Sequence, residues 1–95
     1  MNKKQNNICV IIYKSLSNAT RLDIIRILLS RPYNVAQMSL ILGKRQPLIS
    51  QHLRMLKDSD LIHVKIDGKY RIYRISRKYL QLLKQLTNIY ETTPN

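Results

Sequence analysis

Gly43 and Pro47 lie four residues apart and constrain the fold of this chain more than any other feature. Glycine readily adopts the left-handed conformation that ends many helices. Proline has no N–H to donate, so it fits only the first turn of a helix. Because apolar residues recur at helical spacing on both sides, we expect one helix to end at Gly43 and the next to begin near Gln46. Two short helices joined by so tight a turn form a helix-turn-helix.

The second of these helices, residues 46–57, has two different faces. Ile49, Leu53 and Leu56 fall at i, i+4 and i+7 and make a narrow apolar stripe for packing. The opposite side is polar apart from Pro47, with hydrogen-bonding side chains at its exposed start. Such a helix suits insertion into a DNA groove, and the alternative interpretation is an ordinary solvated surface helix.

A change of apolar period after Asp60 predicts a β-hairpin. Apolar residues then alternate along two short runs, which contain Ile62, Val64 and Ile66, and Tyr70 and Ile72. Asp67-Gly68 between the runs is a signal for a two-residue turn, in which both positions need positive φ. A hairpin that follows a helix-turn-helix is the wing of a winged helix.

Three further helices complete the predicted fold. They cover residues from about 5 to 16, from 19 to 30 and from 77 to 90, and Asn18 is the expected N-cap of the second. The helix that ends at Gly43 opens with a capping box, and its expected inward residues are Val35, Met38, Ile41 and Leu42.

The predicted fold class is therefore mainly α with a β-hairpin wing. Its elements follow the order α-α-α-α-β-β-α of a winged helix-turn-helix, dimeric through the first and last helices. We expect residues 1–95 to form one domain with frayed ends at about 1–5 and 91–95.

The chain is strongly basic, because seventeen Lys and Arg stand against five Asp and Glu and give a net charge of +12. This charge attracts a polyanion, of which nucleic acid is the first candidate. An anionic membrane is the competing partner, but the sequence has no long apolar run and no lipidation signal. Ten of the seventeen basic residues lie between Lys44 and Lys78, around the predicted DNA-facing helix and wing.

The polar face of the helix and the wing supply the candidate DNA contacts. Glutamine can pair with adenine, arginine with guanine, and leucine can touch a thymine methyl. The candidate base contacts are Gln46, Leu48, Ser50, Gln51 and Arg54. The candidate phosphate and wing contacts are Lys44, Arg45, Lys65, Lys69 and Arg71, with Lys69 or Arg71 entering a minor groove. A solvated charge run is the alternative, and His52 is expected to be a packed, hydrogen-bonded residue.

Apolar stripes on the first and last helices exceed what so small a domain can cover, which predicts a twofold dimer. The expected dimer interface contains Ile8, Ile12, Tyr79, Leu82, Leu83, Leu86, Ile89 and Tyr90. Such a dimer would set its recognition helices about 34–36 Å apart, to bind a pseudo-palindrome.

Cys9, the single cysteine, excludes an intrachain disulfide and a multi-cysteine zinc site. It is expected to be a small buried apolar residue. The rival interpretation is a redox switch, in which Cys9 bridges two chains where the first helices meet. Because the N-terminus leads into too few apolar residues for a secretory signal, we expect a cytoplasmic, nucleoid-associated protein.

Three segments resemble the ArsR/SmtB-type repressors. Residues 16–25 (LSNATRLDII) resemble that family's "L-(A/S)-(D/N)-P-T-R-L-x-I-L", and residues 42–56 (LGKRQPLISQHLRML) resemble its recognition segment. Leu61-Ile62 and residues 67–75 are similar to its wing, so the resemblance covers roughly residues 8 to 90. The resemblance implies a homodimeric transcriptional repressor on a twofold-symmetric operator, released by a metal or redox signal.

The chain departs from that pattern where the family binds metals. Residues 33–38 lack the Cys-x-Cys of the arsenic and cadmium sensors, and residues 79–90 hold neither a histidine nor an acid. Without soft or imidazole ligands we expect no metal site. Arg45 replaces the family's N-cap serine, and Asp60 replaces a glycine but tolerates the left-handed conformation.

The leading prediction is a sequence-specific double-stranded DNA-binding regulator, a homodimeric repressor without a cofactor. A nonspecific architectural protein is the alternative, and a wing-mediated protein-interaction module is a third class. No nucleophile–base pair, phosphate-binding glycine loop or carboxylate pair is present, so we expect no enzyme chemistry.

Overall fold

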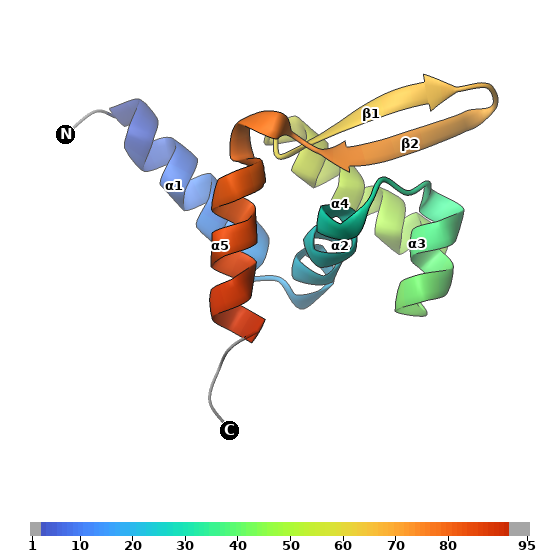
Figure 1. Ribbon diagram of the computed structural model, residues 1–95, viewed down its shortest axis with the longest axis horizontal. Coiled ribbons are helices and arrows are strands. Elements are labelled where there is room, and N and C mark those ends of the chain that lie inside the picture. Colours follow the sequence, from blue (N-terminus) through green and yellow to red (C-terminus); the bar gives the residue numbers. More distant parts are fainter. Residues whose placement is uncertain (1–2, 92–95) are drawn as a thin grey trace.

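Five helices and one antiparallel hairpin make up the computed structural model, which describes the backbone of residues 3–91 and the side chains of residues 8–88 (Figure 1). In chain order the elements are α1 (Lys3–Leu16), α2 (Ala19–Ser30), α3 (Val35–Leu42), α4 (Gln46–Asp58), β1 (Ile62–Asp67), β2 (Tyr70–Ile75), the 3₁₀ turn η1 (Arg77–Tyr79) and α5 (Leu80–Glu91). The predicted order is confirmed, although the last segment begins with the 3₁₀ turn and α1 already begins at Lys3.

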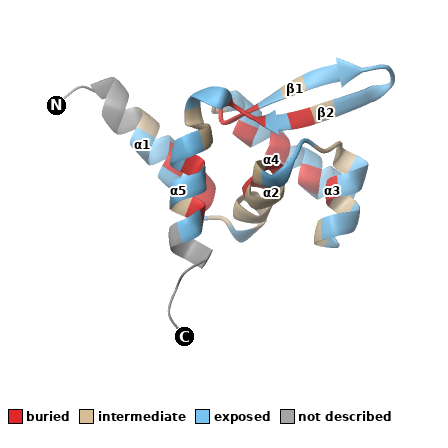
Figure 2. Ribbon diagram, in the orientation of Figure 1, coloured by how far each residue is buried: buried red, intermediate tan, exposed pale blue. Residues whose placement is uncertain are grey.

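Helix α2 lies at the centre of the molecule, with α1 and α5 on one side and α3 and the wing on the other (Figure 1). Its Ile24 and Ile25 have no exposed surface. The buried segments of the other elements face this centre, while the far end of the hairpin is exposed (Figure 2). Each fully buried side chain of this size stabilises the fold by roughly 1.5–3 kcal/mol. The core therefore holds α1 and α5 in one unit with α3 and α4.

The ends of α2, α3 and α4 follow their sequence signals. Asn18 accepts a hydrogen bond from the Arg21 amide at 3.0 Å, and Asn34 and Gln37 cap each other reciprocally at 2.8 and 2.9 Å. Gly43 ends α3 in the left-handed conformation with φ 63°, and α4 begins without a side-chain cap at Arg45. These local predictions are confirmed.

The prediction that Ile41 of α3 belongs to the core is wrong. Ile41 is 51% exposed, whereas Met38 is fully buried. At about 100° per residue, Val35, Met38 and Leu42 share an arc of about 60°, and Ile41 falls outside it. A helix of eight residues buries only that narrow face.

The wing turns one residue later than its sequence predicts. Asp67 pairs with Tyr70, so Gly68 and Lys69 form the turn. Gly68 has φ 62°, and Asp60 is the one non-glycine described residue with positive φ. A turn with positive φ only at its first central position needs just one glycine, so Asp67 stays in the strand.

The loop between α2 and α3 fastens the wing to the helices. Tyr33 and Tyr73 exchange two backbone hydrogen bonds, of 3.2 and 2.9 Å, and form an isolated antiparallel bridge. This bridge brings the start of α3 beside β2. The base of the wing is thereby held at a fixed place relative to the helix-turn-helix.

Candidate nucleic-acid interface

Helix α4 separates its apolar and polar residues as its sequence predicts. Ile49, Leu53 and Leu56 have no exposed surface. All five candidate base contacts are exposed: Gln46, Leu48, Ser50, Gln51 and Arg54. Because the buried stripe fixes the rotation of the helix, these side chains face solvent together, as a DNA-contacting face requires.

A polar cleft of about 530 Å³ joins α4 to the wing. It lies between the start of α3, the outer face of α4 and β2, and Ser50, Arg54 and Arg71 all line it. Lys57 and Asp58 also line it, and neither was a predicted contact. Lys57 lies three residues after Arg54, so the helical period would have placed the two side chains on one side. Three cationic groups from two elements thus meet in one cleft.

Lys69 and Arg71 share a second hollow with the start of α3. This hollow has a volume of about 200 Å³ and also contains Tyr70 in its wall. The Lys69 ammonium lies 5.4 Å from the centroid of the Tyr70 ring, within the range of a cation–π contact.

Lys65 points to the other side of the hairpin. Its direct partner across the strands is Ile72, and directly opposed residues share a face, whereas Arg71 is opposed to Ile66. The wing's predicted contacts are therefore split, with Arg71 toward α4 and Lys65 on the outer face. Lys44 and Arg45 are exposed in the turn before α4, where the Ser39 hydroxyl donates to the Lys44 carbonyl.

The two histidines have different surroundings. His52 is partly buried, with Nδ1 3.4 Å from Nη1 of Arg21, as a packed, hydrogen-bonded residue was expected to be. Its burial, and then the positive charge of Arg21, lower the pKa of the imidazole. His63 lies with Nε2 3.4 Å from the Asp60 carboxylate.

The expected dimer face contains both buried and exposed residues. Tyr79, Leu86 and Ile8 are partly buried, Leu82 is 41% exposed, and Ile12 is buried. Leu83 has no exposed surface, which corrects its assignment to the dimer face, because a side chain inside the core cannot contact a second chain. The side chains of Ile89 and Tyr90 lie outside the described residues.

Helix α1 exposes apolar side chains that the sequence argument did not assign to the dimer face. They are Val10, Ile11 and Tyr13, with exposed fractions of 49%, 39% and 72%. The sequence pattern that could have identified them is the wide apolar face of α1, which is wider than one small domain can cover.

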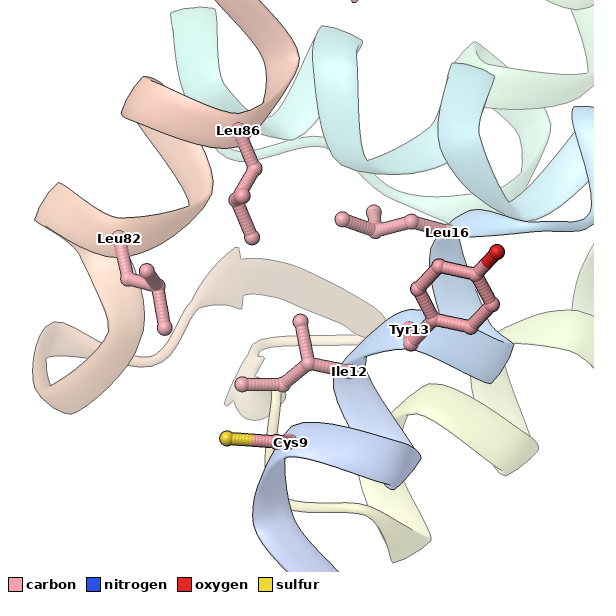
Figure 3. Close-up of a pocket in the computed structure, with 6 residues that line it drawn as sticks. All are labelled: Cys9, Ile12, Tyr13, Leu16, Leu82 and Leu86. Atoms are coloured by element: carbon pink, nitrogen blue, oxygen red, sulfur yellow. The ribbon is translucent and has the colours of Figure 1, made fainter. Parts of the chain in front are cut away.

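An apolar cavity of about 260 Å³ opens between α1 and α5 (Figure 3). Leu82 and Leu86 of α5 face α1 across it, and Cys9 lies at one end beside Ile12 (Figure 3). Cys9 is exposed, so the expectation of a buried cysteine is wrong. It lines the open cavity between α1 and α5 and does not belong to the core.

Neither a metal site nor a membrane span is found among the described residues. Within this part of the chain, no three His, Cys, Asp or Glu side chains gather as metal ligands would. No helix in the same part has the length and apolar character that crossing a bilayer requires.

Residues 18–64 match the family described as bacterial regulatory protein, arsR family. This helix-turn-helix domain belongs to the ArsR family. Its match begins at the N-cap of α2 and ends in β1, so it includes α3, α4 and the turn between them.

Two relatives of this chain are a transcriptional regulator and a repressor. The HTH-type transcriptional regulator KmtR of Mycobacterium tuberculosis is 28% identical over 80 residues, which are 82% of this chain and 62% of that protein. The biofilm growth-associated repressor of Xylella fastidiosa is 29% identical over 93 residues, or 97% of this chain and 81% of the repressor. The chain thus spans less than two thirds of the KmtR sequence.

Solved structures share the fold of this chain over nearly all its length. HlyU from Vibrio cholerae has a TM-score of 0.84 at 26% identity, and the match covers 94% of this chain and 98% of HlyU. A homodimeric winged helix-turn-helix DNA-binding domain from Mycobacterium bovis has a TM-score of 0.83 at 20% identity, covering 96% and 88% of the two chains. The winged-helix fold is therefore confirmed.

Proposed function

We propose that this ArsR-family chain is a homodimeric repressor that binds a pseudo-palindromic operator in double-stranded DNA. The observation that carries the proposal is the cleft in which Ser50 and Arg54 of α4 meet Arg71 of the wing. One duplex can then meet a base-contacting helix and a phosphate-contacting wing at the same time. The regulators among its relatives support the same role.

The two sets of contacts have different tasks. Gln46, Leu48, Ser50, Gln51 and Arg54 contact base edges from the exposed side of α4. Lys44 and Arg45 hold phosphates at the start of that helix, and Lys65, Lys69 and Arg71 hold them from the wing. Lys57 adds a phosphate contact in the cleft.

The dimer forms through α1 and α5. A second copy covers the exposed apolar side chains of α1 together with Leu82, and Ile8, Tyr79 and Leu86 extend that surface. Apolar surface removed from water contributes roughly 25 cal/mol per Å². A solved structure with the same fold is homodimeric, which supports the formation of a dimer. Ile12 contributes through the wall of the cavity, and Ile89 and Tyr90 are proposed to continue the same stripe.

Cys9 supplies a redox response within this dimer. Its exposed position on α1 allows the thiols of two protomers to meet when the first helices pair. A peroxide would oxidise both thiols to one disulfide and be reduced to water, with the two thiol protons leaving in the water formed. A crosslink on non-reducing electrophoresis after peroxide treatment supports this step. Its absence, with an unchanged response of Cys9→Ser, refutes it.

The protein acts without catalysis, cofactor or metal in the cytoplasm, bound to the nucleoid. The positive charge that concentrates between Lys44 and Lys78 drives this association with DNA. We also propose that residues 1–95 act as one domain.

Selection of bound sites from random duplexes tests the proposal. We expect a conserved site with two inverted halves, bound about 10³-fold or more tightly than random DNA. Equal binding to all duplexes would contradict the proposal and favour a nonspecific architectural protein. Weak binding without salt dependence would instead favour a protein-interaction module.

A further inference from the structure

Arg21, in the first turn of α2, joins the end of α1 to α4. Its Nε donates to the carbonyl oxygen of Ser15 at 3.3 Å, and its Nη2 donates to that of Lys14 at 3.2 Å. Both carbonyls belong to the last turn of α1, where backbone oxygens lack partners within the helix and a cation is favoured. One edge of the guanidinium therefore caps the helix that carries the proposed dimer face.

The other edge of the same guanidinium meets α4. Nη1 lies 3.4 Å from Nδ1 of His52 and donates to Sδ of Met55 at 3.6 Å. Arginine has no acceptor, so Nδ1 of His52 must accept the bond, and the imidazole must be neutral with its proton on Nε2. His52 and Met55 each follow directly after a proposed base contact, Gln51 and Arg54.

We propose that Arg21 is a positioning residue for operator recognition, because its guanidinium ties the end of the dimer helix α1 to the base-contacting helix α4. Apolar packing of α4 is non-directional, whereas the guanidinium fork has fixed directions. The buried stripe of α4 sets which face of the helix meets the core. The fork holds the helix at one exact rotation within that packing, and with it the direction of Gln51 and Arg54. This inference rests on the proposed function of α4.

Protonation of His52 opens this contact. An imidazolium has no acceptor at Nδ1, and it would place a second cation 3.4 Å from Nη1 of Arg21. The groups that face this contact are Arg21 from α2, the neutral thioether of Met55 on α4, and the carbonyls of Lys14 and Ser15 on α1. Burial and the charge of Arg21 lower the pKa of His52, which keeps the imidazole neutral near neutral pH. Acid should therefore loosen α4 and weaken operator binding.

The first test compares Arg21→Lys with the wild type on the selected operator and on random DNA. Lysine keeps the charge but loses the fork, so the preference for the operator should fall about tenfold while random-DNA binding stays the same. Sedimentation and circular dichroism establish that the variant is a folded dimer. An unchanged preference in the folded variant overturns the inference.

The second test is the pH profile of operator preference, which a merely structural role would not move. As the pH falls below the ordinary imidazole pKa of 6.5 and through the lowered pKa of His52, the wild-type preference should fall. His52→Gln, which keeps an acceptor but does not titrate, should show none of this fall. His63→Gln is the matched control and should follow the wild type, because His63 lies at the foot of the hairpin beside Asp60.

The pH profile also decides the question when Arg21→Lys does not fold. Parallel profiles for the wild type and His52→Gln overturn the positioning role, even if both proteins select an operator. A wild type that selects no operator at any pH refutes the proposed function itself. The two failures are therefore distinguishable.

Discussion

The α4–wing side and the α1–α5 side of this protein expose opposite kinds of surface. The first presents Arg54, Lys57 and Arg71 around one polar cleft, and the second presents Tyr13 and Leu82 around an apolar cavity. Polar and charged side chains are well hydrated, and a cluster of positive charges attracts a polyanion. A clustered apolar surface is poorly hydrated and favours contact with a protein partner. The difference supports the proposal that the chain meets DNA on one side and its own copy on the other.

The largest expected effect comes from breaking the apolar side. Leu82→Glu places a charge on the proposed dimer face, at a side chain exposed enough to leave the protomer folded. We expect monomers in sedimentation and a loss of operator affinity of about 10²–10⁴-fold, because two half-sites no longer bind as one unit. Leu40→Glu is the matched control, since Leu40 is 85% exposed on α3, away from this face. A Leu82→Glu dimer would contradict the assignment of the apolar side.

Base recognition is the next effect in size. Arg54→Ala or Gln51→Ala should cost roughly 1–3 kcal/mol on the selected operator and little on random DNA. Competition binding measures both, and Lys84→Ala on the exposed side of α5 is the control for loss of a positive charge. Equal losses on operator and random DNA would make these residues phosphate contacts.

A substitution of Arg71 distinguishes phosphate contacts from base contacts on the proposed DNA-binding surface. Arg71→Ala should weaken binding to all sequences alike and reduce the slope of log affinity against log salt by about one. A salt titration of binding, with Lys84→Ala again as the control, measures this slope. A change in sequence preference without a change in slope would show that Arg71 contacts a base.

The smallest effect is the pH dependence of stability. Because the pKa of His52 is lower in the folded chain than its ordinary value of 6.5, the folded chain binds fewer protons than the unfolded chain in this range. The free energy of unfolding should therefore decrease as the pH falls through 6.5. Below the pKa of His52 in the folded chain, this residue should cause no further change. Denaturant midpoints at several pH values measure this, and His52→Gln should remove the dependence that His63→Gln retains. Identical curves for the wild type and His52→Gln would contradict it.

Local signals made the helix-turn-helix predictable from the sequence. Three local features each fix a helix end through hydrogen bonds or dihedral angles within a few residues. They are the capping pair of Asn34 with Gln37, the left-handed Gly43, and Pro47 in the first turn of α4. The wing turn was predicted one residue early, because Asp67-Gly68 and Gly68-Lys69 both place the glycine where φ is positive. Sequence spacing alone does not distinguish these two registers.

Burial was harder to predict than helix position, because it depends on which elements meet in space. Ile41 and Cys9 are exposed although their residue types are usually buried, and Leu83 is buried although it lies on a stripe assigned to the dimer. Likewise, the contact of Arg21 with His52 joins residues 31 positions apart. No local sequence pattern predicts a contact between residues so far apart, so the contact is seen only in the folded structure.

The spacing of the two operator halves tests the central claim most directly, that α4 of each protomer contacts one half of a twofold site. Inserting about five base pairs between the halves of the selected operator rotates them by about half a turn of the duplex. We predict that affinity falls by about two orders of magnitude or more, to the level of a single half-site. Unchanged affinity for the lengthened operator would contradict the claim.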